Sequence, residues 1–434
     1  VLLNICNGGV MTLTEKILAR AAKLDKVKAG DIVWVDVDKA MMDDILGPRI
    51  EIAEKMKELN LKIWNPDNVT IISDHYTPPA NAHQASIVKF TRDWAKENEV
   101  KHYYEFAGPC HQVMIEKSRV LPGEIILGTD SHTCTYGALG AFSTGIGSTE
   151  MLGVLATGKI WLKVPETIKI NFVGKMNKGV MAKDLILAAI GKIGHAGATY
   201  KALEFSGEVI DNLIMDERLC IANMAVEAGA KNGIMRVDEK TKEYLKNLDL
   251  ELTPEVIELL STNSSDGVAQ EITIDVSEIY PLCSCPHEVD NVEEIAKIEG
   301  VKIDQAYIGS CTGGRYNDLK LAADILKERK IAEGVRLLIS PASKEVWERC
   351  AKDGILQTLS EAGATVLASS CGACLGIHSG AIGEGEVCIS STNRNFIGRM
   401  GSKKGEVYLA SPLSVAAAAL TGYIVDPRKF IEEE

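Results

Sequence analysis

The chain has 434 residues, of which 46% are hydrophobic and 25% charged, and a formal net charge of −13 at pH 7. This length and apolar content allow a large core and predict two to three domains. The acidic balance, without a basic face, argues against a nucleic-acid-binding protein. No apolar run approaches the ~20 residues of a membrane span, and eleven cysteines in so long a chain do not suggest a secreted disulfide framework. We therefore expect a cytoplasmic protein.

The N-terminal residues 1–10 lack the basic region and the long apolar core of a signal peptide. We interpret them as an N-terminal extension, native or not, upstream of a better start at Met11. Thr12 and Glu15 then form a capping-box pattern, which predicts that a helix begins at this point.

Short β-branched runs alternate with helical stretches along the rest of the chain, which is typical of α/β units. We expect strands at 31–37, 69–73, 124–128, 167–174, 304–309, 364–368 and 386–390. We expect helices at 82–97, 183–193, 317–328 and 412–421. Changes in composition divide the chain into three predicted α/β domains, at 11–165, 166–290 and 291–434.

Unusual polar clusters directly follow five of the expected strands. They are Asp74–His75, Asp130–Ser131–His132, Ser310–Cys311, Cys371 with Cys374, and Asn393–Arg394. In open α/β sheets, ligands bind beyond the carboxyl ends of the strands, where helix N-termini offer free N–H groups. Five clusters in this position predict one site assembled from several loops.

Cys371 and Cys374 form a C-x-x-C pair, which fits a redox dithiol, half of a zinc site or part of an iron–sulfur ligand set. Cys311 supplies a third thiol in the analogous place sixty residues earlier. A structural zinc site needs four ligands, and we interpret Cys283 and Cys285 as structural because C-x-C lacks the usual two-residue spacer. Three thiolates on a [4Fe–4S] cluster would leave one iron without a protein ligand, free to act as a Lewis acid.

Three histidines stand near strand ends and acidic residues, at His75, His111 and His132. A carboxylate neighbour can fix the tautomer of an imidazole and raise its basicity. We interpret the histidines at 83, 102, 195, 287 and 378 as structural. A Ser-His-Asp hydrolase is the competing interpretation, but the chain has no G-x-S-x-G elbow, and Ser131 lies between its own Asp and His.

Arg394 and Arg399 lie five residues apart in one predicted loop. Two guanidinium groups suit a dicarboxylate or tricarboxylate bound in a bidentate manner, whereas a solvated surface pair is the alternative. The Gly-rich stretch 138–158 misses the dinucleotide-binding fingerprint, so we interpret it as close packing near the site.

Seven segments, in order along the chain, resemble the aconitase superfamily, and the resemblance runs from about Thr12 to Pro427. They are SDH (73–75), CHQ (110–112), GTDSHTCTYGALGAF (128–142), ANMAVE (222–227), GSCTGGR (309–315), CGAC (371–374) and TNRNFIGR (392–399). The resemblance implies three α/β domains packed around a central [4Fe–4S] cluster. Two positions differ from the usual pattern: Gly313 replaces an Asn, and Asp43 stands where related two-chain enzymes have the His of a His-Asp pair.

The resemblance also implies roles for individual residues. The implied catalytic residues are Asp74, His75, His111, Asp130, His132 and Glu227. The implied substrate-binding residues are Ser131, Arg394 and Arg399. The implied ligands of the cluster, which has one labile iron without a cysteine ligand, are Cys311, Cys371 and Cys374, with Asn223 and Asn393 beside them. We expect His75 to act as the acid with Asp74 as its support, His111 to pair with Glu227, and His132 to pair with Asp130.

Full-length aconitases carry a further, swivelling domain that holds a serine base. We expect this fourth domain to be absent from the chain and to reside on a small subunit, as in isopropylmalate isomerases and some homoaconitases. The implied reaction isomerises a 2-hydroxy dicarboxylate by dehydration and rehydration. We expect the substrate to be the 3-isopropylmalate/2-isopropylmalate pair of leucine biosynthesis, with citramalate as a further substrate, and no nucleic-acid or membrane partner. The alternatives are a homoaconitase, a dimethylmalate dehydratase and a thiol-redox protein that uses Cys371 and Cys374.

Overall fold

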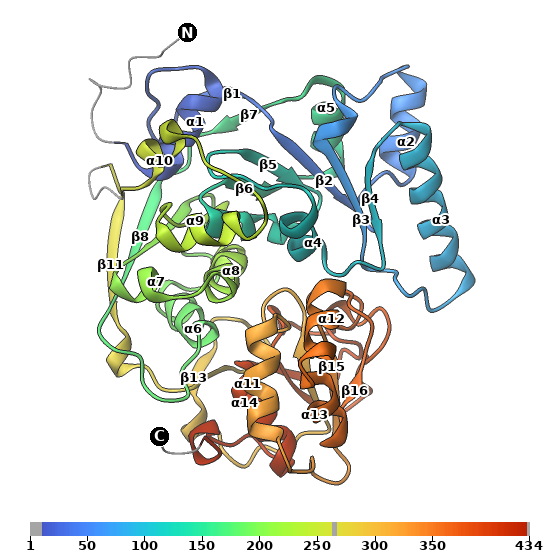
Figure 1. The fold of residues 1–434 in the computed structure, drawn as a ribbon, viewed down its shortest axis with the longest axis vertical. Helices are drawn as coiled ribbons and strands as arrows, with labels where there is room; N and C mark the ends of the chain where they lie inside the picture. Colours follow the sequence, from blue (N-terminus) through green and yellow to red (C-terminus); the bar gives the residue numbers. More distant parts are fainter. Residues whose placement is uncertain (1–10, 263–266, 432–434) are drawn as a thin grey trace.

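The computed structural model describes residues 11–262 and 267–431, so the expected extension at 1–10 lies outside the described residues. Three β-sheets, each with helices packed on it, make up most of the molecule. In Figure 1 the first sheet lies at the top, the second at the left and the third at the bottom. The arrangement confirms the predicted class, an α/β protein with three sheet-centred parts.

The first part of the chain is built on a parallel sheet in the order β4–β3–β2–β5–β6, next to an antiparallel ribbon of β1 and β7. The strands are β1 (Ile32–Asp36), β2 (Lys39–Asp43), β3 (Val69–Ser73), β4 (His102–Glu105), β5 (Ile125–Gly128), β6 (Phe142–Gly145) and β7 (Lys159–Lys163). The helices are α1 (Leu13–Ala22), α2 (Ile50–Glu58), α3 (Ala82–Glu97), α4 (Cys110–Lys117) and α5 (Ser148–Thr157), with 3₁₀ turns η1 (Pro66–Asn68) and η2 (Ser131–Leu139). The predicted capping box of Thr12 and Glu15 forms at the start of α1.

The second part has a parallel sheet in the order β10–β9–β8–β11. Its strands are β8 (Thr167–Val173), β9 (Ala202–Ser206), β10 (Asn232–Ile234) and β11 (Gln270–Asp275). Its helices are α6 (Ala182–Ile193), α7 (Glu208–Asn212), α8 (Met215–Asn223), α9 (Glu239–Lys246) and α10 (Pro254–Leu260), with 3₁₀ turns η3 (Met224–Ala228) and η4 (Val276–Glu278). Helix α8 packs against η2 and so joins this part to the first.

The third part has a mixed sheet in the order β13–β12–β18–β17–β14–β15–β16, antiparallel only where β12 meets β13 and β18. Its strands are β12 (Leu282–Ser284), β13 (Val292–Glu294), β14 (Gln305–Gly309), β15 (Arg336–Ser340), β16 (Thr365–Val366), β17 (Val387–Ser390) and β18 (Glu406–Ala410). Its helices are α11 (Tyr316–Leu326), α12 (Lys344–Lys352), α13 (Ile355–Glu361) and α14 (Pro412–Thr421), with 3₁₀ turns η5 (Ile295–Lys297), η6 (Ala373–Leu375) and η7 (Pro427–Lys429). Strand β12 belongs to this sheet, so the sheet begins before residue 291, where the third domain was predicted to start. The exact domain boundaries stay a prediction.

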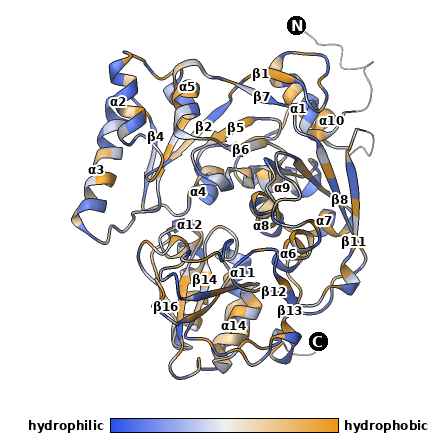
Figure 2. Cartoon of the chain, turned by 180° about the vertical axis from the view of Figure 1, so that it is seen from behind, coloured by the Kyte–Doolittle hydropathy of each residue, from blue (hydrophilic) through white to orange (hydrophobic). Residues whose placement is uncertain are grey.

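Hydropathy explains which elements lie inside. Strand β3, of sequence VTIIS, is buried at every residue, as expected for a mostly β-branched strand in a sheet covered on both faces. Helix α14 is apolar along most of its length and almost wholly buried, whereas α3 alternates polar and apolar stripes in Figure 2, as a helix with one exposed face does. The strand and helix segments predicted from the sequence are all present, most within one or two residues of the expected ends, although β16 is shorter.

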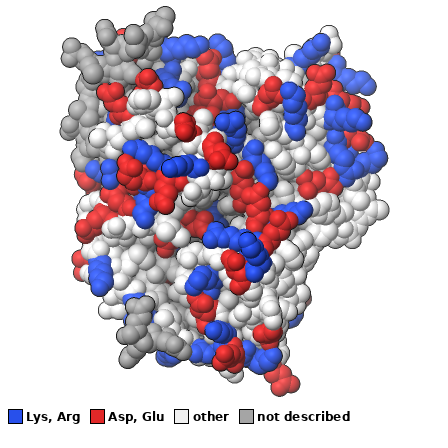
Figure 3. All heavy atoms as spheres, in the orientation of Figure 1, with Lys and Arg blue, Asp and Glu red and all other residues white. Residues whose placement is uncertain are grey.

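Two features of the described residues concern possible membrane and nucleic-acid partners. In the part of the chain that the structure describes, no helix combines the length and the apolar character that a membrane crossing requires. On the face drawn in Figure 3, acidic and basic side chains are intermixed.

Candidate functional site

The loops that follow β3, β5, β14, β16 and β17 meet in one place. The backbone N–H of Cys371 donates to the carbonyl oxygen of Asp74 at 2.9 Å, which joins the loop after β16 to the loop after β3. The Arg394 guanidinium donates to the Ser131 hydroxyl at 3.0 Å, which joins the loop after β17 to the loop after β5. These contacts span up to 300 residues of sequence, so the structure brings the polar clusters singled out from the sequence into one site.

His75 lies directly after β3 among carboxylates. Its Nδ1 faces Asp74 Oδ1 at 2.7 Å, while Asp44 accepts the backbone N–H of His75 at 3.0 Å. Burial opposes protonation of the ring, but the carboxylates of Asp74, Asp44 and Asp43 outweigh it and raise the pKa of His75 well above its usual range. A protonated imidazole with one nitrogen fixed by a carboxylate has the form that a general acid needs.

Of the other two histidines, His132 lies beside Asp130 as expected, with its Nδ1 3.4 Å from Asp130 Oδ1, but the pairing expected for His111 differs. His111, at the start of α4, bonds Asp130 through Nε2 at 2.7 Å. His132 Nε2 instead bonds Glu227 in η3 at 2.7 Å, and its backbone N–H donates to Asp130. The predicted pairing of His111 with Glu227 is therefore wrong. The side chain of Asp130 caps η2, and that geometry points one oxygen at His111.

Asp130, which is partly buried, and Glu227, which is buried, are carboxylates that stay ionised. Burial opposes ionisation, but His111 and His132 lower the pKa of Asp130 well below its usual range. Burial likewise opposes ionisation of Glu227, whose pKa is lowered by His132 and Arg394. Buried charges of this kind persist because each has an imidazole or guanidinium partner. The result is a chain of ion pairs from His111 through to Arg394.

Five predicted residues line a pocket of about 470 Å³: His75, Asp130, Ser131, Arg394 and Arg399. The pocket lining also includes the apolar residues Ile45, Leu46, Ile146 and Leu375. The Nε of Arg399 is buried and, within the described residues, has no hydrogen-bond partner. A buried donor at a pocket wall normally has a partner, so a bound anion is the natural acceptor for this one.

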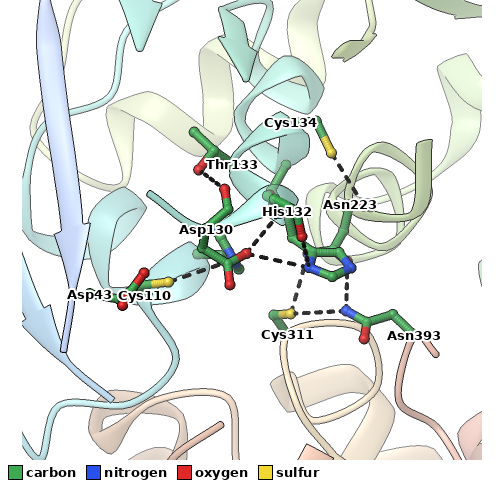
Figure 4. Close-up of polar contacts among 12 residues, drawn as sticks. Asp43, Cys110, Asp130, His132, Thr133, Cys134, Asn223, Cys311 and Asn393 are labelled. Atoms are coloured by element: carbon green, nitrogen blue, oxygen red, sulfur yellow. Dashed lines mark hydrogen bonds and ion pairs between the residues drawn. The ribbon is translucent and has the colours of Figure 1, made fainter. Parts of the chain in front are cut away.

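The three predicted thiols lie near the residues that line the pocket, and Cys374 contacts one of them, Arg399. Asn223, the last residue of α8, donates through Nδ2 to Cys311 Sγ at 3.2 Å, and Figure 4 shows Asn223, Cys311 and Asn393 converging. Cys374 Sγ contacts Asn393 at 3.5 Å and Arg399 at 3.6 Å.

Burial raises the pKa of the Cys311 thiol to about 11. Burial and the carboxylate of Asp74 raise the pKa of Cys371 well above its usual range. Such thiols stay protonated at neutral pH unless a cation replaces their protons, as a metal or cluster iron does.

Lys183 is a buried cation beside these thiols that the sequence reasoning missed. It is the second residue of α6 and only 1% exposed. Its ammonium donates to Thr312 Oγ1 at 3.2 Å and to the carbonyl oxygens of Ser391 at 3.0 Å and Thr392 at 2.5 Å. Although burial lowers its pKa, three acceptors hold the ammonium where the loops of Cys311 and Asn393 meet. A lone Lys in a helical pattern carries no local signal of burial.

His378 was interpreted as a structural residue from the sequence, and the structure places it against the site. Its Nε2–H donates to the carbonyl oxygen of His75 at 3.0 Å. A Cβ at Gly372 would lie 2.1 Å from the His378 ring, so the position between Cys371 and Cys374 needs glycine. His378 therefore holds the C-x-x-C loop against the loop of the candidate acid.

The two departures from the aconitase pattern have physical explanations. A Cβ at Gly313 would lie 2.3 Å from the Ser391 hydroxyl oxygen, which donates to the carbonyl of Gly309, so an Asn at 313 would not fit unless this strand end moved. Asp43 accepts the backbone N–H of Ile45 at 2.6 Å and the Thr129 hydroxyl at 2.8 Å. Asp43 is thus held by the turn after β2, and burial raises its pKa to about 6.

Comparisons with known proteins agree along nearly the whole chain. A family model, Aconitase family (aconitate hydratase), matches residues 15–299 and 287–422. The chain is 45% identical, over 97% of its length and 99% of the relative, to 3-isopropylmalate dehydratase large subunit 1 of Methanopyrus kandleri. It is 46% identical, over 96% of its length and 99% of the relative, to the corresponding large subunit 1 of Archaeoglobus fulgidus. A solved structure, Thermococcus kodakaraensis aconitase X in its holo-form, has the same fold at 12% identity and a TM-score of 0.50, covering 83% of this chain and 84% of that one.

Proposed function

Because the chain belongs to the aconitase family, we propose that it is the large subunit of a hydro-lyase that interconverts 3-isopropylmalate and 2-isopropylmalate. The reaction removes water from a 2-hydroxy dicarboxylate and adds it back with the opposite regiochemistry. The convergence of three thiols with His75, Arg394 and Arg399 around one pocket carries this proposal. The names of the relatives, all large subunits of 3-isopropylmalate dehydratase, support it.

The residues present fit the iron–sulfur cluster of the aconitase family. Cys311, Cys371 and Cys374 would hold a [4Fe–4S] cluster, and the described cysteines are all free thiols. The amides of Asn223 and Asn393 and the guanidinium of Arg399 donate to these thiols, which suits an anionic cluster. When bound, the cluster supplies a labile iron without a cysteine ligand, which acts as a Lewis acid on the hydroxyl and a carboxylate.

His75 would protonate the departing hydroxyl group. Its Nδ1 is directed at Asp74, so the proton for the substrate lies on Nε2, which is 4.0 Å from Asp130 Oδ2. The raised pKa of His75 keeps that proton in place at neutral pH until a leaving group takes it. Asp74 is itself fixed by the backbone N–H of Cys110, so the acid is orientated before substrate arrives.

The remaining residues would orientate the substrate. Arg394 is fixed by Glu227 at 2.8 Å and contacts Ser131, which places a guanidinium and a hydroxyl side by side for one carboxylate. Arg399, with its unpartnered Nε, would bind at the side of the thiols. His111 and His132 would hold the hydroxyl or water through nitrogens whose tautomers their carboxylates determine.

The apolar residues in the pocket lining favour an alkyl substituent. Ile45, Leu46 and Ile146 offer no partner for the extra carboxylate of homocitrate, whereas they suit the isopropyl group or the methyl group of citramalate. A small subunit would complete the site with the swivelling domain, the catalytic base and further substrate contacts. A reducing cytoplasm, as we propose for this enzyme, keeps the thiols available for iron.

Anaerobic reconstitution with iron and sulfide tests the proposal. We expect about four irons and four acid-labile sulfides per chain. Mixed with a small subunit of a 3-isopropylmalate dehydratase, the loaded chain should convert 3-isopropylmalate faster than homocitrate. Retained zinc, or thiols that take up no iron under reducing conditions, would contradict the cluster. If the loaded enzyme prefers homocitrate, the proposed hydro-lyase chemistry would stand, but the proposed substrate would be wrong.

A further inference from the structure

Arg315 is a buried cation to which the proposed function gives no role. It caps the N-terminus of α11, four residues after Cys311, and its side chain is 0% exposed. Its backbone N–H donates to the Asp318 carboxylate at 3.0 Å. At the preceding residue, Gly314, a Cβ would lie 2.6 Å from the Ser340 carbonyl oxygen. The backbone that carries this guanidinium is therefore fixed in the same loop as the cysteine.

The Arg315 side chain reaches from the third part of the chain to α4 in the first part. Its Nε donates to Gln112 Oε1 at 2.9 Å, and both side chains are buried. Gln112 directly follows His111, whose ring is bonded to Asp130. The other end of the Gln112 amide donates to Glu116 at 2.9 Å. Because both ends of the amide are engaged, its orientation is determined, and the bond from Arg315 acts on the first turn of α4.

Helix α4 also contacts α12 of the third part, above which it lies in Figure 1. The Ser343 hydroxyl, which caps α12, donates to Glu116 at 2.8 Å. The backbone N–H of Lys344 donates to the carbonyl oxygen of Ala107 at 2.8 Å. These contacts hold the last turn of α4 and the chain that enters it, and the bond from Arg315 holds the first turn.

Stability of the fold does not account for Arg315. Its Nη1 and Nη2 are buried and have no hydrogen-bond partner among the described residues. A buried cation that lacks partners costs stability, and an apolar side chain of similar volume often replaces one without loss. Within the described residues, the bond that the guanidinium does make is the one to Gln112. This side chain therefore supplies a defined position for α4 rather than stability.

We propose that Arg315 is a positioning residue for His111: through Gln112 it fixes where His111 lies relative to the loop of Cys311. The inference rests on the proposed function, in which His111 holds the hydroxyl group or water of the reaction. A displacement of about 1 Å at the reacting groups can cost about 100-fold in rate. Without the guanidinium, the first turn of α4 can shift, and His111 loses its fixed place.

Steady-state kinetics of the iron-loaded enzyme with a small subunit test the effect on the reaction. We expect Arg315→Met to lower kcat about 100-fold, with KM within about twofold of the wild type and the iron content unchanged. Gln112→Met removes the same bond and should behave alike. The double variant should be no slower than either single variant, because both act through one bond. Loss of iron from Arg315→Met, or a double variant about 10⁴-fold slower than the wild type, would overturn the proposal.

Arg218→Met is the matched control for removal of a buried guanidinium. Arg218 is 1% exposed, but it bonds Asp238 in the second part of the chain, away from α4. This variant should keep kcat within about threefold of the wild type, since it breaks no contact of α4. If it loses as much kcat as Arg315→Met, the effect is not one of position and the proposal is wrong.

Hydrogen–deuterium exchange of the reduced, iron-free chain tests the positioning without cluster or substrate. The backbone N–H of Gln112 donates to the carbonyl oxygen of Pro109 at 3.0 Å, so its exchange reports opening of the first turn of α4. We expect residues 110–117 to exchange about tenfold faster in Arg315→Met and Gln112→Met than in the wild type and Arg218→Met. Equal exchange in all four proteins would refute the proposal. A wild type that does not convert isopropylmalate would contradict the proposed function, whereas the exchange rates would still decide whether Arg315 holds α4.

Discussion

The site has two halves, which differ in how their polar groups are satisfied. In the half supplied by the first part of the chain, His75 and His111 each face a carboxylate at 2.7 Å. In the half supplied by the third part, the thiols of Cys311 and Cys374 accept from amide and guanidinium donors. The first half is a network of histidine–carboxylate pairs, and the second is a set of thiols with hydrogen-bond donors beside them.

This difference indicates a division of labour. A network that is already paired can hold a proton at a defined atom, because moving the proton costs the energy of an ion pair. A buried set of thiols ringed by donors is suited to receive an anionic group, which the donors then stabilise. Glu227 and Arg394 join the halves, since Glu227 bonds both His132 and Arg394. Substitutions in the two halves should therefore impair the protein in different ways, and four substitutions test this.

The largest effect is expected for Cys311→Ser in the second half. Loss of a cluster ligand should remove the iron and with it a Lewis acid that contributes several kcal/mol, so activity should fall about 10³-fold or more. Iron analysis measures the loss of iron, and an assay with a small subunit measures the loss of activity. Cys350→Ser, whose thiol is buried in the core of the third part, should keep its iron. Full activity of Cys311→Ser would favour a thiol-redox role for Cys371 and Cys374 instead.

Glu227→Gln should break the junction between the halves without removing the cluster. It deprives His132 and Arg394 of their shared carboxylate, and we expect kcat to fall about 100-fold while the iron content stays the same. Glu105→Gln, which changes a carboxylate paired with Arg92 at the surface, is the control. If kcat is unchanged, the pairing has no part in catalysis.

Lys183→Met should weaken the second half alone. It leaves the Thr312 hydroxyl and two backbone carbonyls without their buried donor, at a cost of about 3 kcal/mol in the free energy of unfolding. Guanidinium unfolding of the apo chain measures the loss, and the rate of iron release from the loaded chain should rise. Lys192→Met, at the exposed end of the same helix, should change stability by less than about 0.5 kcal/mol. A similarly small change in the free energy of unfolding for Lys183→Met would show that the Lys183 ammonium does not stabilise the folded chain.

The smallest effect concerns the pH dependence of the first half. Burial raises the pKa of Asp43 from the usual 3.8 to about 6, so the folded state binds this proton more tightly than the unfolded state. The resulting stability is complete below pH 4 and is lost as pH rises through about 6. Relative to Asp43→Asn, the wild type should lose about 1–3 kcal/mol between these values.

Unfolding curves of both proteins at several pH values measure the loss at Asp43. Asp25→Asn, at an exposed position, is the control and should follow the wild type. A constant difference between wild type and Asp43→Asn would contradict the raised pKa.

The sequence was informative where local patterns determine the structure. The strand before Asp74 and the strand before Asp130 were predicted from short β-branched and apolar runs. The polar clusters that begin at Asp74 and Asp130 come directly after the ends of those strands. The partner of His111 could not be predicted, because it depends on how Asp130 is turned by its cap on η2. Lys183 and His378 were missed for a related reason. Their roles arise from contacts with Thr392 and His75, which lie 209 and 303 residues away in sequence.

The bonds that join the C-x-x-C loop to the loop after β3 have a consequence for biosynthesis. Translation proceeds from the N-terminus, and domains generally fold in that order as they leave the ribosome. The carbonyl groups of Asp74 and His75, which accept hydrogen bonds from Cys371 and His378, are therefore in place before Cys311, Cys371 and Cys374 have been made. The nascent cysteines therefore close onto a wall that is already folded.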